Sequence, residues 1–227
     1  MPKEVGYLIN YPGKLEGERG IYFDYILAGN GLFIEAANPM LSARIPVGEC
    51  DIRGLAPIKT RISLTYGSIP QSFFDLALER FLAEPERESY LGVIANAGYH
   101  VFLPDQQKEE AKVVYDIGRS VILDIHSHGH MEAFFSEDQD DKDETGLQLY
   151  AVIGNLKDTP MVALRVGVYG YFWPLKWKDV FDGTLCGASE FLEEEVVQNE
   201  LHSSLGGEHD GPELRRGRMW WDRWFRR

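Results

Sequence analysis

Alternating apolar and polar positions mark several β-strands in the first third of the chain. Residues 21–36 are rich in β-branched and aromatic residues on both sides of Gly29-Asn30-Gly31. An Asn-Gly pair between two apolar runs is a strong signal for a β-hairpin. Residues 58–66 alternate in the same way and indicate a further strand. We therefore predict a β-rich N-terminal segment over residues 1–66.

Residues 71–84 follow a helical pattern instead. Their apolar residues recur at spacings of three and four, which places them on one face of a helix. Pro70 suits the first turn of this helix, and Pro85 ends it. The apolar residues expected on the buried face are Phe73, Phe74, Ala77, Leu78, Phe81 and Leu82.

After this helix the pattern is mostly that of strands, followed by one more helix and a polar tail. A second helix is predicted over residues 188–201, and the Gly-rich residues 203–218 are predicted to be a linker. The order of elements predicts an α+β fold. We divide the chain into residues 1–66, a domain over 67–182, and a C-terminal part over 183–227. The predicted strands are 88–95, 99–103, 110–117, 120–128, 147–156 and 161–172.

Charge and composition narrow the classes of partner. The formal net charge is −13, with acidic residues concentrated at 137–144 and 190–195, which argues against nucleic-acid binding through phosphate contacts. Residues 211–227 differ, because they carry six arginines and three tryptophans; we expect this tail to dock on the protein's own acidic surface. Apolar runs are too short to span a bilayer, so no membrane partner is expected.

The cysteines give no sign of a disulfide framework. Cys50 and Cys186 lie far apart and outside any Cys-x-x-Cys pair. A reducing cytoplasm is therefore the expected location. We expect both thiols to be small buried residues, because nothing near them indicates a nucleophile.

Three histidines stand at alternate positions at the end of the strand predicted over 120–128. Side chains at i and i+2 share one strand face, so His126 and His128 can bind one metal ion, with zinc–nitrogen distances of about 2.0–2.1 Å. His130 follows Gly129 and is expected in a loop. An aspartate from the acidic stretch 137–144 can supply a third ligand. The alternative is a polar loop beside a solvated acidic surface.

This stretch resembles the motif of the JAMM (MPN+, JAB) metalloproteases. That motif reads His-x-His, seven residues, Ser, two residues, Asp, with a glutamate on an earlier strand. Ser136 stands at the serine position, after His128. The resemblance covers roughly residues 20–180 and includes YILAGNGLFIEA and GVYGYFWPL; it is strongest to bacterial members, in particular protein A of the PRTRC cassettes. It implies a mixed β-sheet flanked by helices, layered as in cytidine deaminases.

The position of the third metal ligand departs from the family pattern. The pattern puts the aspartate three residues after Ser136, where this chain has Gln139. A single inserted residue before DDKDE makes Asp140 the ligand, and this is our prediction. Asp138 is the alternative.

The resemblance also implies a glutamate on an earlier strand. Glu88 stands at the head of the apolar run 88–95 and is our choice for this residue. Glu86 is the second candidate, whereas Glu84 is still expected on the helix.

The function implied by the resemblance is zinc-dependent hydrolysis. His126, His128 and Asp140 would hold Zn²⁺, Glu88 would act as general acid and base, and Ser136 would stabilise the oxyanion. The bond cleaved would be an amide or isopeptide at the C-terminus of a ubiquitin-like or sulfur-carrier-like protein. A ThiF-like activating enzyme is a further expected partner, since PRTRC cassettes encode one. The alternative is a protein-binding scaffold of MPN type without metal.

Overall fold

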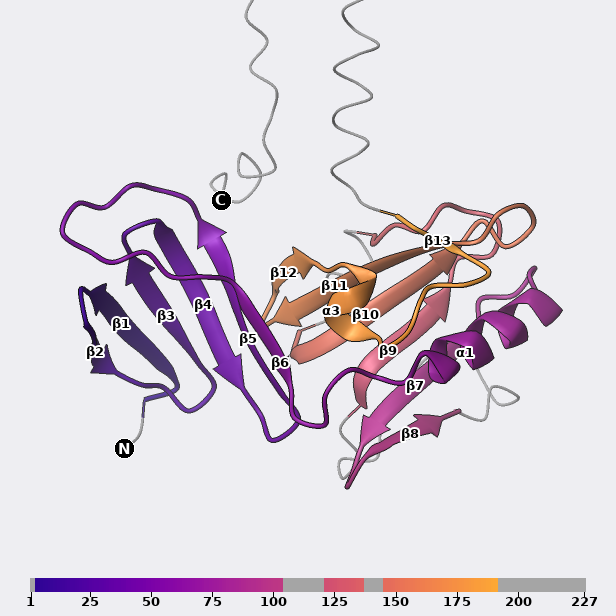
Figure 1. Cartoon of the computed structure of the whole chain (residues 1–227), viewed down its shortest axis with the longest axis horizontal. Coiled ribbons are helices and arrows are strands. Elements are labelled where there is room, and N and C mark those ends of the chain that lie inside the picture. Colours follow the sequence, from indigo (N-terminus) through magenta and orange to yellow (C-terminus); the bar gives the residue numbers. More distant parts are fainter. Residues whose placement is uncertain (1–2, 104–120, 137–144, 192–227) are drawn as a thin grey trace, which may run out of the picture. The chain divides into compact units, whose positions relative to one another are not determined.

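The computed structural model describes residues 3–103, 121–136 and 145–191 (Figure 1). Within these ranges the chain forms two β-sheets, a helix α1 and a short helix α3. No helix of these ranges is long and apolar enough to cross a membrane. The strand predicted over 110–117, the acidic stretch 137–144 and the tail 203–227 lie outside the described residues.

The first sheet is built from residues 5–64 and has the strand order β2-β1-β3-β4-β5-β6. β3 and β4 form the expected hairpin, because Ala28 pairs with Gly31 and leaves Gly29 and Asn30 as the turn. The strand predicted over 58–66 is shorter than expected. The bounds are β1 Val5–Tyr11, β2 Lys14–Glu18, β3 Phe23–Ala28, β4 Gly31–Ala37, β5 Leu41–Gly48 and β6 Arg61–Leu64.

The second sheet has the order β12-β11-β10-β9-β7-β8, with β13 paired to β11. β9 lies between β7, to which it is antiparallel, and β10, to which it is parallel. Parallel neighbours require a long crossover, and the part of this connection that the structure describes covers residues 128–136 and 145–146. The bounds are β7 Tyr90–Ala95, β8 Tyr99–Phe102, β9 Val121–Ser127, β10 Leu147–Gly154, β11 Met161–Val168, β12 Tyr171–Pro174 and β13 Ser189–Glu190.

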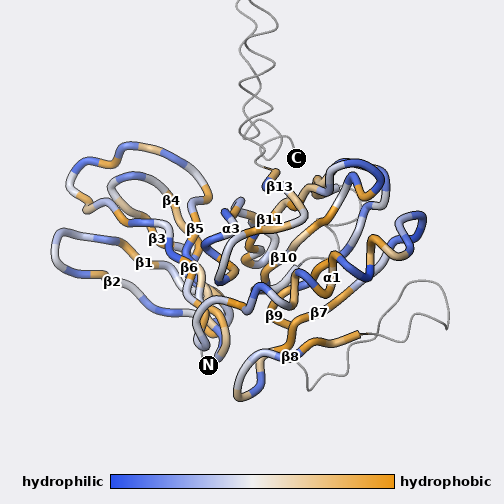
Figure 2. The backbone as a smooth tube through the Cα atoms, turned by 45° about the vertical axis from the view of Figure 1, so that its right-hand side comes forward, coloured by the Kyte–Doolittle hydropathy of each residue, from blue (hydrophilic) through white to orange (hydrophobic). Residues whose placement is uncertain are grey.

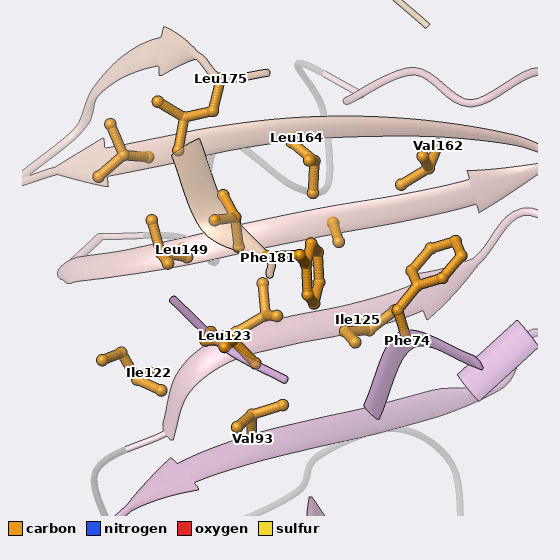
Figure 3. Close-up of a cluster of buried hydrophobic side chains, with 14 of the residues drawn as sticks. Phe74, Val93, Ile122, Leu123, Ile125, Leu149, Val162, Leu164, Leu175 and Phe181 are labelled. Carbon is orange, nitrogen blue, oxygen red and sulfur yellow. The ribbon is translucent and has the colours of Figure 1, made fainter. Parts of the chain in front are cut away.

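Helix α1 (Gln71–Ala83) packs its apolar face against the second sheet. Phe74, Ala77, Leu78 and Phe81 are buried as predicted, whereas Leu82 is 43% exposed because the buried stripe is narrower than expected. Figure 3 shows Phe74 over β9, close to Ile125 and to Phe181. Figure 2 shows apolar residues concentrated along strands β7 to β11, which supply much of this core.

Aromatic rings join α1 to the short helix α3 (Trp177–Val180). The ring of Phe74 meets Trp177 edge-on at 4.9 Å between centroids, and Trp177 stacks on Phe181 at 4.3 Å. Such pairs add about 0.5–1.5 kcal/mol beyond the burial of their area. They therefore fix the helices over the sheet that carries the histidines.

Two further expectations are wrong within the described residues. The helix predicted over 188–201 begins instead as strand β13, because Ser189 and Phe191 donate backbone hydrogen bonds to Pro160 and Val162, at 2.9 and 2.8 Å. The rest of that range lies outside the described residues. The cysteines are exposed rather than buried, since both lie in loops.

The observed arrangement is α+β with mixed sheets, as predicted. The range predicted as one strand over 161–172 is divided by a turn into β11 and β12, and Gly170 has a φ of 85° there. The layering of cytidine deaminases and the division at residues 66 and 182 stay predictions.

Candidate metal centre at the end of strand β9

Strand β9 places polar side chains on the sheet face opposite the α1 core. Leu123, Ile125 and Ser127 are fully buried, whereas Asp124 and His126 are half-buried. This alternation follows from the strand period of two. Asp124 and His126 therefore share one face, and the next position on that face is His128.

The two imidazoles lie close together. The ring centroids of His126 and His128 are 5.3 Å apart, and the rings are inclined at 45°. The Nε2 atom of His126 and the Nδ1 atom of His128 are both buried. Two imidazoles that bind one tetrahedral zinc ion at about 2.0–2.1 Å have their centroids roughly 5 Å apart. The spacing therefore fits a shared ion.

A carboxylate orients the first ring. Nδ1 of His126 lies 3.3 Å from Oδ1 of Asp124. Metal-binding histidines commonly bond a carboxylate through the second ring nitrogen, which fixes the ring and its tautomer. Asp124 was not singled out in the sequence, although its position two residues before His126 on an alternating strand is the signal that could have found it.

The described residues do not complete a metal site. Among them, no group of three or more His, Cys, Asp or Glu side chains is placed to hold an ion. The predicted third ligand Asp140 and its alternatives, Asp138 and Gln139, lie in 137–144, outside the described residues. The part of the candidate site within the described residues is thus the histidine pair with Asp124.

The segment that carries Glu88 runs beside the histidines. The backbone N–H of Ser127 donates to the carbonyl of Ser89 at 2.9 Å, and Tyr90 pairs with His126 where β7 begins. Glu88 itself is exposed. The backbone of the predicted general base and the predicted ligands therefore lie on neighbouring segments, although the part that Glu88 plays stays a prediction.

Glu86 is engaged elsewhere. Its carboxylate lies 2.5 Å from Nε2 of His130 and 2.7 Å from Nζ of Lys157. These partners, Lys157 above all, lower the pKa of Glu86 below its ordinary value. A carboxylate with a lowered pKa is a poorer acceptor for a proton that must later be passed on. His130 lies in the turn after β9, as expected, and contacts Glu86.

The connection after β9 is packed tightly on the end of β10. Backbone N–H groups of Asn155 and Leu156 donate to the carbonyls of Met131 and Gly129, at 2.6 and 2.8 Å. At Gly154, an added Cβ would lie 2.4 Å from the carbonyl carbon of Glu132. Only glycine allows this approach without movement of the backbone.

A buried arginine fixes the residue before Ser136. The guanidinium of Arg165 on β11 is 3.9 Å from the ring centroid of Phe135 and 3.9 Å from that of Phe172. Arg165 is 7% exposed. Phe134 also contacts His128, with ring centroids 5.0 Å apart. No residue near Phe135 in the sequence indicates this stacking, which connects the Ser136 segment to β11 and to a predicted metal ligand.

Gly154→Ala should lower the free energy of unfolding by about 1–3 kcal/mol, the usual cost of forcing extra atoms into a packed region. The added methyl group would displace residues 131–133 and with them the start of the Ser136 segment. Urea unfolding measures this. Gly146→Ala is the matched control, because a Cβ at Gly146 meets no atom within 4 Å. Equal stability of the two variants would contradict the packing described here.

Comparison with known proteins identifies the domain. Residues 76–167 match the model of a family described as prokaryotic homologs of the JAB domain. No curated protein matches the chain, and the similarity to PRTRC protein A stays a prediction. The matched range contains β7 to β10 and most of β11, together with Glu88, the histidine pair and Ser136. Residues 76–167 therefore form a domain of the JAB/MPN family.

Proposed function

We propose that the end of β9 is the centre of a zinc-dependent, JAMM-type peptidase or isopeptidase. One observation carries the proposal. Ser89 and Ser127, 38 residues apart in the sequence, are hydrogen-bonded, so the Glu88 segment lies beside two histidines whose spacing fits one metal ion. An acid–base residue next to a pair of metal ligands is the arrangement that metal-assisted hydrolysis requires.

His126 and His128 would hold the ion, and Asp140 is proposed as the third protein ligand. The contact with Asp124 would keep His126 in one tautomer and one orientation. A bound zinc ion supplies a Lewis acid and a water whose pKa is lowered to about 7. Side chains of the protein would carry out the proton transfers and stabilise the oxyanion.

Glu88 would accept a proton from the attacking water and pass it to the leaving amine. The hydroxyl of Ser136 would donate a hydrogen bond to the oxygen of the tetrahedral intermediate. The stacking of Phe135 on Arg165 supports this assignment, because it restrains the backbone next to Ser136. The ion pair of Glu86 with Lys157 and its contact with His130 favour Glu88 over Glu86 as the base.

The proposed substrate is an amide or isopeptide bond at the C-terminus of a ubiquitin-like or sulfur-carrier-like protein. A ThiF-like activating enzyme is proposed as a further partner. Both proposals rest on the JAMM resemblance and the JAB family match. The cytoplasm is the proposed location, since Cys50 and Cys186 are free thiols.

Cleavage of reporter fusions tests the function. Purified protein loaded with one equivalent of zinc should cleave a ubiquitin-like or sulfur-carrier-like fusion after the carrier's last residue. A chelator should abolish cleavage, and zinc should restore it, because the reaction depends on the Lewis acid. Mass spectrometry of the products locates the bond. Cleavage that continues unchanged after complete removal of metal would contradict the proposal.

A protein-binding scaffold is the second candidate. Gln139 favours it, because it stands where the family pattern has the aspartate ligand. In that case the protein should bind a ubiquitin-like fusion without cleaving it, and zinc should not change the affinity. Zinc-loaded protein that binds the fusion and leaves it intact would decide for the scaffold.

A further inference from the structure

The side chain of Ser127 is completely buried although it is polar. Buried hydroxyl groups are nearly always hydrogen-bonded. Its partners lie in the segment before β7 rather than in its own strand. The Oγ atom accepts a hydrogen bond from the N–H of Ser89 at 2.9 Å and donates one to the carbonyl of Arg87 at 3.3 Å.

These two bonds enclose one residue. Arg87 and Ser89 are the neighbours of Glu88, so its backbone is held from both sides by a single oxygen atom. β7 begins only at Tyr90, and at Ser89 the hydroxyl takes the place of a backbone acceptor. The two bonds thereby hold residues 87–89 against β9, although these residues precede β7.

We infer that Ser127 is a positioning residue for Glu88, an inference that rests on the function proposed above. Ser127 stands between His126 and His128 in the sequence. Its hydroxyl therefore connects the two proposed metal ligands to the segment that carries Glu88. Its side chain points to the core side of β9, while the imidazoles lie on the other face. Ser127 therefore fixes the backbone from which the Glu88 side chain extends. It does not contact the substrate itself.

Other contacts keep the neighbouring segments together when this hydroxyl is removed. The N–H of Ser127 still donates to Ser89, and Glu86 still contacts His130. Ser127→Ala should thus fold and bind zinc, and only the local position of Glu88 should loosen. Misplacement of a catalytic group by about 1 Å can cost about 10²-fold in rate.

The experiment compares Ser127→Ala with Ile125→Val. Ile125 is a fully buried residue on the same face of the same strand, and its apolar side chain makes no hydrogen bond that the change to Val could remove. In Ser127→Ala, the amide of Ser89 should exchange its hydrogen at least about tenfold faster. The kcat for the reporter fusion should fall by about 10- to 100-fold at unchanged KM and zinc content. Ile125→Val should show neither effect.

A second comparison tests whether Ser127 acts through Glu88. In a Glu88→Gln background, Ser127→Ala should cause no further fall in kcat, because the group that it positions is already inactive. An equal fall in both backgrounds would overturn the inference, and so would unchanged exchange at Ser89. If the wild type cleaves nothing, the proposed function fails, and the exchange rate at Ser89 alone decides whether Ser127 holds this segment.

Discussion

Glu88→Gln protein should keep its zinc and lose 10²- to 10⁴-fold in kcat, about the contribution of a positioned proton-transfer group. Glutamine has nearly the shape of glutamate but cannot accept the proton. The backbone bonds of Arg87 and Ser89 to Ser127 do not involve the side chain at 88, so the segment should stay in place. Single-turnover cleavage of a reporter fusion, with zinc content measured on the same sample, gives the result.

Glu86→Gln is the matched control, because Glu86 lies two residues before Glu88 and is also exposed. This change weakens the ion pair with Lys157 and the contact with His130 at the protein surface, which should alter kcat little. If Glu88→Gln cleaves as fast as wild type while Glu86→Gln does not, Glu86 rather than Glu88 is the base.

Replacement of both histidines, His126→Ala with His128→Ala, should abolish zinc binding. The wild type should bind about one zinc ion per chain, and free zinc at 100 times the dissociation constant should raise its free energy of unfolding by about 2.7 kcal/mol. The double variant should gain nothing. Metal analysis after gel filtration and thermal unfolding with and without zinc measure the two quantities. Undiminished zinc in the variant would contradict the assignment.

Single substitutions test the proposed third zinc ligand, with metal analysis after gel filtration as the measurement. Asp140→Ala should lower the zinc content, whereas Asp138→Ala should not. Glu132→Ala controls for the loss of negative charge, since Glu132 is an exposed acidic residue of the same connection. A loss of zinc in Asp138→Ala alone would show that the chain has no inserted residue before Asp140.

Local patterns predicted those parts of the fold that depend on neighbouring residues. The hairpin of β3 and β4 was predictable because an Asn-Gly pair stands between two apolar runs, although the turn itself consists of Gly29 and Asn30. The buried face of α1 and the closeness of His126 and His128 follow from the helix and strand periods. The histidine pair is therefore the part of the candidate site that the sequence describes best.

Contacts between distant segments were not predictable in this way. Nothing near Ser127 in the sequence indicates that its hydroxyl binds residues 87–89, and nothing near Arg165 indicates stacking on Phe135. At Ser189 the helical pattern was overridden, because pairing with β11 satisfies backbone groups that a helix would satisfy internally. These features depend on which strands become neighbours, and a single sequence does not give that.

The central place of β9 in its sheet has a thermodynamic consequence for ligand binding. β9 is hydrogen-bonded to β7 on one side and to β10 on the other, so the His126 backbone is ordered before any ion arrives. In zinc fingers, by contrast, the free energy of metal binding is also the free energy of folding. Here the entropy of ordering the histidine-bearing strand is already lost when the sheet forms. A zinc ion at the proposed site would then leave and return while the sheet stays folded, so reconstitution of apoprotein should not require refolding of this strand.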